Sequence, residues 1–129
     1  MAGARSPRRG RLSRSADFDR VMRSGRSYAG RELVLYIFPS GGDDSPRMGM
    51  SVSRKVGGAV ERNSVKRLLR EAFAQESHKL GHGSDVVVIA RPGARELAER
   101  EGLSGIQTAL GELLEKATQS RSSEGRLKT

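Results

Sequence analysis

The residues of this chain that are best suited to chemistry are cationic side chains gathered in one segment. Between residues 47 and 70, seven Lys or Arg side chains accompany a single acidic residue, Glu61. Solubility alone does not require such an imbalance, whereas closely spaced guanidinium and ammonium groups bind the phosphates of a nucleic acid well. We therefore predict a nucleic-acid-binding face in this segment. The seven cations are Arg47, Arg54, Lys55, Arg62, Lys66, Arg67 and Arg70.

Side chains that would make the protein a catalyst by itself are missing from the sequence. It has no cysteine, which excludes disulfides, cysteine-ligated zinc and a thiol nucleophile. The spacing of His78 and His82 suits a metal on a helix, but Gly81 lies between them at the predicted helix end, so we interpret both as solvent-facing. Gly57 and Gly58 lack the rest of a phosphate-binding loop. We predict no catalytic residue and no metal site formed by the protein's own side chains.

The composition indicates the class of protein. The chain has 129 residues, a net charge of +9 and 35% hydrophobic residues, which fits one small domain with a modest core. The first 70 residues carry a net charge of +10 and the remainder −1. The longest apolar run, 86–90, is far too short to span a membrane, and no apolar segment follows the N-terminal arginines as a secretion signal requires. We expect a cytoplasmic protein that binds nucleic acid and has no membrane partner.

The spacing of apolar residues predicts the elements that position these cations. The predicted order, α-β-β-α-β-α with a small mixed sheet of three or four strands, is an α/β two-layer sandwich. We expect a disordered basic arm over 1–11, a single domain over 12–117 and a disordered tail over 118–129. The elements are a helix from Ser15 to Gly25, strands at 31–38, 48–53 and 85–90, a helix through 65–73 that ends at Gly81, and a helix at 103–117.

The helix through 65–73 has an apolar stripe and a separate basic arc. Val65, Leu69 and Phe73 recur at helical spacing, so the stripe is expected to pack on the sheet. At about 100° per residue, the polar side chains fall on an arc of about 140°, which is left to face a partner. The arc contains Arg62, Asn63, Lys66, Arg67 and Arg70.

Aromatic and hydroxyl side chains on neighbouring elements could extend this face. Phe18 on the first helix and Tyr36 on a strand offer rings on which unpaired bases stack. Ser51, Ser53 and Lys55 bring hydroxyls and a cation to the next strand and its exit. Periodicity leaves an ordinary core role for Phe18 and Tyr36 equally open.

Several blocks of the sequence resemble the bacterial ribonuclease P protein subunit family. The run 47–57 (RMGMSVSRKVG), followed by 59–63 (AVERN), Lys66-Arg67 and 70–73 (REAF), looks like the signature of that family. Further similar blocks stand at Asp17-Phe18, Gly25, 33–36 and 85–91, and the resemblance covers residues 11–116.

The resemblance implies the protein subunit of an endoribonuclease whose catalytic RNA removes the 5′ leader of precursor tRNA. It implies ribonuclease P RNA and precursor tRNA as partners, Mg²⁺ held mainly by the RNA, no DNA partner, and a rare left-handed βαβ crossover. The leader would lie in a cleft lined by Phe18, Tyr36, Ser51, Ser53 and Lys55. The arginine-rich motif that contacts the catalytic RNA would comprise Arg62, Asn63, Lys66, Arg67 and Arg70.

Three residues depart from the pattern of the family. Met22 stands where many members carry a second cleft phenylalanine, Ser64 replaces an arginine of a short R-N-R run, and Gly58 replaces a polar residue. The alternative function is a ribosomal-type structural RNA-binding protein with no role in processing. A protein-only nuclease would need metal-binding carboxylates, which the sequence does not bring together.

Overall fold

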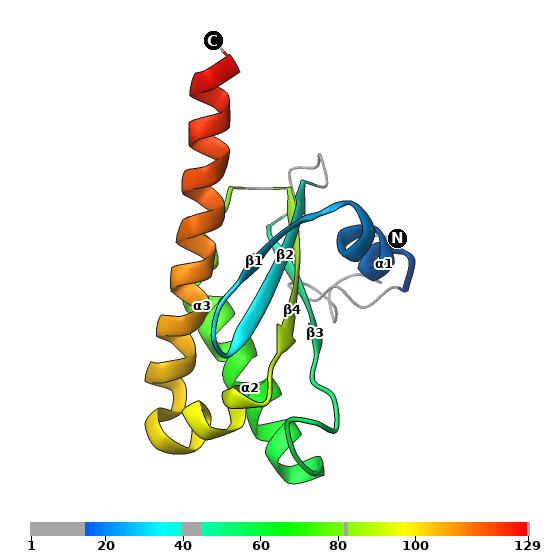
Figure 1. The fold of residues 1–129 in the computed structure, drawn as a ribbon, viewed down its shortest axis with the longest axis vertical. Helices are drawn as coiled ribbons and strands as arrows, with labels where there is room; N and C mark the ends of the chain where they lie inside the picture. The colour runs from blue at the N-terminus through cyan, green and yellow to red at the C-terminus, as the bar shows by residue number, and fades with distance from the viewer. Residues whose placement is uncertain (1–14, 40–44, 82, 129) are drawn as a thin grey trace.

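A central sheet with helices on both faces forms the body of the molecule (Figure 1). The computed structural model describes residues 15–39, 45–81 and 83–128, so the expected N-terminal arm and His82 lie outside the described residues. The elements are α1 (Ser15–Ser24), β1 (Arg26–Ala29), β2 (Leu33–Pro39), β3 (Arg47–Ser51), α2 (Ala59–Glu76), a short 3₁₀ helix (Ser77–Lys79), β4 (Ser84–Ala90) and α3 (Gly93–Lys128).

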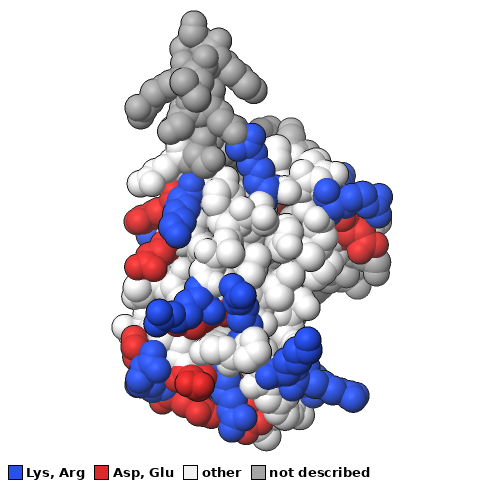
Figure 2. Space-filling view, viewed as in Figure 1, with Lys and Arg blue, Asp and Glu red and all other residues white. Residues whose placement is uncertain are grey.

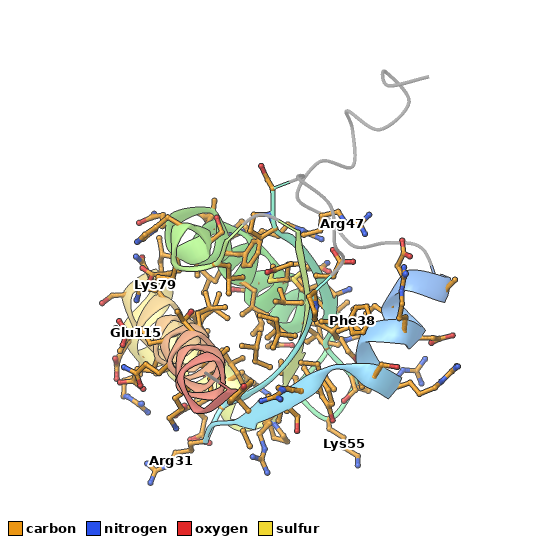
Figure 3. The ribbon with its side chains drawn as sticks, turned by 90° about the horizontal axis from the view of Figure 1, so that it is seen from above. Arg31, Phe38, Arg47, Lys55, Lys79 and Glu115 are labelled. Atoms are coloured by element: carbon orange, nitrogen blue, oxygen red, sulfur yellow. The ribbon has the colours of Figure 1, made fainter. Side chains whose placement is uncertain are left out.

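The sheet is mixed and has four strands in the order β1-β2-β4-β3. β2 pairs antiparallel with both β1 and β4, whereas β3 and β4 are parallel and are joined through α2. Seen from above, α2 and α3 lie on one side of the strands and α1 lies on the other (Figure 3). The predicted mixed α/β class is confirmed. The left-handedness of the β3-α2-β4 crossover stays a prediction.

The sequence did not indicate β1, so the predicted element order lacks one strand. β1 pairs Ser27 with Tyr36 and Tyr28 with Leu35. Tyr28 is its one half-buried residue, and the other three are exposed. Because this edge strand contributes a single large side chain to the core, it has no apolar alternation that would reveal it.

The two faces of β2 separate the main core from the surface under α1. Leu33, Leu35 and Ile37 are buried against the layer of α2 and α3, while the alternate residues of the strand are half-buried on the other face. β4 is buried on both faces, with Val86 and Val88 in the main core and Val87 beneath α1. The central position of β4 explains its nearly continuous apolar sequence.

Helix α3 is longer than the sequence predicted and is bent near its start. The backbone at Gly102 has φ 61° and ψ −144°, a conformation that glycine adopts without steric cost, and two helical segments meet there. The helix extends to Lys128, past the helix end predicted at residue 117. Because no proline interrupts the chain after Pro92, nothing at this end forces the helix to stop. The division into arm, domain and disordered tail stays a prediction.

A polar cluster fastens the end of α2 to the middle of α3. Lys79 Nζ lies 2.8 Å from Glu76 Oε1 and 3.0 Å from Glu115 Oε2, and the Gln107 amide donates to Glu76 Oε2 at 2.7 Å. The hydrogen bonds from Lys79 and then Gln107 lower the pKa of Glu76, and those to Glu76 and then Glu115 raise the pKa of Lys79. A lowered carboxyl pKa stabilises the fold above the ordinary carboxyl range, and this contribution is lost as the pH falls through the folded-state pKa.

The junction of α1 and β1 has no room for a side chain. A Cβ added to Gly25 would lie 2.5 Å from the Val21 carbonyl oxygen and 2.7 Å from that of Ile37, whereas one added to Gly81 would meet nothing within 4 Å. Both obstacles at Gly25 are backbone atoms, which cannot rotate away. We predict that Gly25→Ala lowers the free energy of unfolding by about 1–3 kcal/mol.

Chemical denaturation of Gly25→Ala beside Gly81→Ala tests this prediction. The Gly81 variant is the matched control and should be as stable as the unmodified protein or slightly more so, because alanine restricts the unfolded chain. Equal stability of the two variants would contradict the close approach of α1 and β2.

Candidate nucleic-acid interface

The sheet face under α1 carries a small second cluster of apolar and aromatic side chains. Val21 of α1 and Val87 of β4 are fully buried at its centre. Around them, half-buried, lie Phe18, Met22, Tyr36, Phe38 and Ile89. We call these seven residues the α1 cluster. Phe18 and Tyr36, predicted as stacking residues, thus come together from different elements.

Both aromatic residues have a packing role and an accessible surface. Phe18 and Tyr36 pack against the buried pair of valines, yet neither ring is itself fully buried. Because Phe18 and Tyr36 are only half-buried around Val21 and Val87, part of each ring faces outward. A packing role and a stacking role are therefore compatible for both residues. An aromatic surface of this kind can accept an unpaired base.

Hydroxyl and cationic side chains continue this surface along β3. Ser51 is in register with Ile89 on the neighbouring strand, and residues in register project from the same face, so Ser51 adjoins the α1 cluster. Ser53 and Lys55 follow in an exposed turn, where the Ser53 hydroxyl accepts a 3.3 Å hydrogen bond from the Lys55 amide. Lys55 extends away from the body of the protein (Figure 3).

The turn after β3 leads directly into the basic helix. Val56 is buried and its amide donates to the Ser53 carbonyl at 3.0 Å, which closes the turn. At the start of α2, Glu61 Oε1 accepts a 2.9 Å hydrogen bond from the Gly58 amide and satisfies one free donor of the helix end. Figure 2 shows Lys and Arg side chains projecting from the end of the molecule where this turn and the first turns of α2 lie.

The arginine-rich motif occupies the outward side of α2. Val65, Leu69, Ala72 and Phe73 are the buried residues of this helix, as its periodicity predicted. In contrast, Asn63, Arg67 and Arg70 are exposed, and Arg62 and Lys66 are half-buried. Arg67 Nε lies 3.9 Å from Glu71 Oε1, which is a weak ion pair on the surface, so the guanidinium remains accessible.

A charged network at the other end of the α1 cluster was not found from the sequence. Asp85 is 1% exposed, and its carboxylate accepts two hydrogen bonds from Arg47, 3.0 Å from Nε and 2.9 Å from a terminal nitrogen. That terminal nitrogen also lies 3.7 Å from Asp17 Oδ2 on α1. The available signal was an aspartate at the start of an otherwise apolar strand, because a buried carboxylate requires a partner.

The comparison with known proteins identifies the family. A family described as Ribonuclease P matches residues 6–118. The chain belongs to the ribonuclease P protein family. It is 42% identical over 100 residues to the ribonuclease P protein component of Bacillus pumilus. The aligned region covers 78% of this chain and 84% of the relative.

Solved structures of ribonuclease P proteins share the fold. The Staphylococcus aureus RNase P protein has a TM-score of 0.73 and 36% identity, covering 84% of this chain and 94% of the other. The Thermotoga maritima RNase P protein has a TM-score of 0.73 and 33% identity, with 82% and 96% covered. This chain is accordingly the protein component of the ribonuclease P endoribonuclease, acts in tRNA 5′ processing and works with ribonuclease P RNA. The ribosomal-type alternative is not favoured.

The described residues lack both a metal-binding cluster and a helix that could span a membrane. Among the described residues of this ribonuclease P protein, no group of three His, Cys, Asp or Glu side chains is placed to hold a metal ion. None of the helices within the described ranges is long and apolar enough to cross a membrane.

The buried carboxylate of Asp85 makes Arg47 important for stability. We predict that Arg47→Ala lowers the free energy of unfolding by about 3–5 kcal/mol, because the change leaves a buried charge without its partner. Denaturation of the free protein measures the loss. Adding Asp85→Asn to that variant removes the unpaired charge and should restore part of the stability. If Arg47→Ala alone is as stable as the unmodified protein, this role of Arg47 is contradicted.

Proposed function

We propose that the surface formed by the α1 cluster and the end of β3 binds the single-stranded 5′ leader of precursor tRNA. In this proposal Phe18 and Tyr36 stack on leader bases, Ser51 and Ser53 bond to the backbone or base edges, and Lys55 pairs with a phosphate. The arginine-rich motif of α2 contacts ribonuclease P RNA, so the protein bridges the leader and the catalytic RNA.

The observation that carries the proposal is the meeting of Phe18 and Tyr36 on one sheet face. Their rings lie half-buried beside Val87, and Ser51 continues the same face toward exposed Ser53 and Lys55. Single-stranded RNA is commonly bound by this combination of accessible rings and nearby cations. Mature tRNA lacks the leader and would have no such partner here.

The exposed side of α2 supports the second half of the proposal. Its accessible side chains are rich in guanidinium groups, which bond to phosphate with two parallel hydrogen bonds. The helix begins directly after the turn that contains Ser53 and Lys55, so a leader on the sheet face and an RNA on α2 would lie next to each other.

The protein contributes charge and position to the reaction. Phosphodiester cleavage with Mg²⁺ needs ligands for the metal, and the described side chains include no cluster that fits it. The proposal therefore assigns Mg²⁺ mainly to the RNA subunit. The net charge of +9 on the protein would reduce repulsion between precursor tRNA and catalytic RNA.

Reconstitution tests this division of labour. We expect protein incubated with precursor tRNA and Mg²⁺ to yield no mature 5′ end, and addition of ribonuclease P RNA to yield correct cleavage. The Mg²⁺ midpoint for cleavage should be lower with the protein than with RNA alone at fixed monovalent salt, since protein cations replace part of the metal's screening. Correct cleavage by protein alone, or unchanged midpoints, would contradict the proposal.

Tyr36 provides the test of leader binding. We predict that Tyr36→Ala weakens binding of precursor tRNA to the reconstituted holoenzyme by about 1–3 kcal/mol, the size of one lost base–aromatic stack. Binding of mature tRNA should change little. The measurement is the equilibrium affinity of each variant holoenzyme for both RNAs at one salt concentration.

The matched control for this prediction is Tyr36→Phe, which keeps the ring and removes the hydroxyl. It should bind precursor tRNA nearly as well as the unmodified protein. A melting curve of each free variant separates binding from folding, because removing a buried ring can itself cost about 3–5 kcal/mol. Equal losses for precursor and mature tRNA would show a folding role for Tyr36 and no stack on the leader.

A further inference from the structure

A series of charged contacts connects α1 to each of the three strands beneath it. Arg47 of β3 joins Asp85 of β4 to Asp17 of α1. Asp17 also pairs with Arg20, whose guanidinium lies 5.8 Å from the ring centre of Phe38 on β2. We call these five residues the α1 anchor. The anchor ties one helix to strands that are distant in sequence.

The strand side of the anchor is rigid. The Asp85 side chain is 2% exposed, and it holds the Arg47 guanidinium through two hydrogen bonds of 3.0 Å and 2.9 Å. A bidentate interaction of this kind fixes both the distance of the guanidinium from the carboxylate and the orientation of its plane. Arg47 and Asp85 are also in register on neighbouring strands, so the backbone holds them side by side. The guanidinium is thus a fixed point above the sheet.

On the helix side, the Asp17 carboxylate makes the contact with Arg47. Asp17 Oδ2 lies 3.7 Å from the fixed guanidinium, and the Asp17 side chain is 16% exposed. Asp17 is the residue directly before Phe18. The contact therefore acts on the helical turn that presents the Phe18 ring, whereas Val21 secures the next turn through its burial against Val87.

We propose that Asp17 is a positioning residue for the RNA leader, which holds the first turn of α1 over the sheet through Arg47 and so fixes the spacing of the Phe18 and Tyr36 rings. The inference rests on the proposed leader surface and adds a residue that has no suitable contact with RNA of its own, because a carboxylate repels phosphate. Without the Asp17 contact, the first turn of α1 would rely on the partial packing of Phe18 against the α1 cluster and would move more freely.

The sign of the effect separates positioning from ordinary electrostatics. Replacing an acid by a neutral amide makes the protein more positive, and by charge alone any such change tightens binding to RNA. A positioning role predicts that Asp17→Asn weakens binding to precursor tRNA. For Asp19, an exposed acid on the same helix, the loss of negative charge should still tighten binding. Asp17→Asn and Asp19→Asn change the net charge equally and form a matched pair.

Equilibrium binding to the reconstituted holoenzyme tests the proposal. If the first turn is in place about a tenth to a third of the time in Asp17→Asn, affinity for precursor tRNA falls about three- to tenfold. Affinity for mature tRNA should not fall, and Asp19→Asn should bind both RNAs as tightly as the unmodified protein or more tightly. Loss of affinity for precursor and mature tRNA alike, or equal behaviour of the two variants, would overturn the proposal.

A distance measurement supplies the readout that a change in charge would not move. The sequence has no cysteine, so Ala16→Cys on the first turn of α1 and Thr108→Cys on α3, both exposed positions, accept spin labels at two unique sites. The distance distribution between the labels should broaden with Asp17→Asn and stay narrow with Asp19→Asn. A narrow distribution with Asp17→Asn would overturn the proposal even if affinity for precursor tRNA fell.

Failure of this inference is distinct from failure of the proposed function. If Tyr36→Ala weakens precursor binding selectively while Asp17→Asn behaves as Asp19→Asn does, the leader surface stands and only the positioning role is wrong. If Tyr36→Ala has no selective effect, the leader surface itself is wrong.

Discussion

The burial of β4 on both faces is the constraint on which the rest of the structure depends. Val86 and Val88 require a cover on one side of the sheet and Val87 requires one on the other. Helices α2 and α3 provide a complete cover for the first side. The single short helix α1 covers the second only in part, and this incomplete cover leaves the five outer residues of the α1 cluster half-buried around Val21 and Val87. A protein with this strand order thereby obtains an accessible aromatic surface without exposing its main core.

The most periodic elements could be predicted from the sequence, together with the residues they present. The apolar stripe of α2 identified both its buried side and the outward position of Arg67 and Arg70, because one helical period determines the two. The alternation of β2 likewise separated Leu35 from Tyr36. Strand β1 and the continuation of α3 past Ala117 have no such periodicity. Strand β1 depends on its pairing with β2, and α3 continues because no proline stops it.

Contacts between distant residues were the part that the sequence could not supply. Arg47 and Asp85 are 38 positions apart and meet only because β3 and β4 are parallel and in a particular register. The meeting of Phe18 with Tyr36 also depends on where α1 rests on the sheet. The resemblance to a family predicted that second meeting, whereas hydrophobic spacing allowed either a core or a surface role for each ring. Physical reasoning from one sequence thus finds faces more readily than it finds partners.

The order of the strands also bears on how the protein avoids self-association. β1 and β3 are the two edges of the sheet, and their unpaired backbone groups could in principle accept a strand from another copy. Both edges are short, four and five residues, and both begin with an arginine, Arg26 and Arg47. Short edges that carry charge are poor templates for adding strands, and a net charge of +9 repels a second copy at a distance. The same net positive charge that suits the protein to RNA therefore also disfavours association with a second copy.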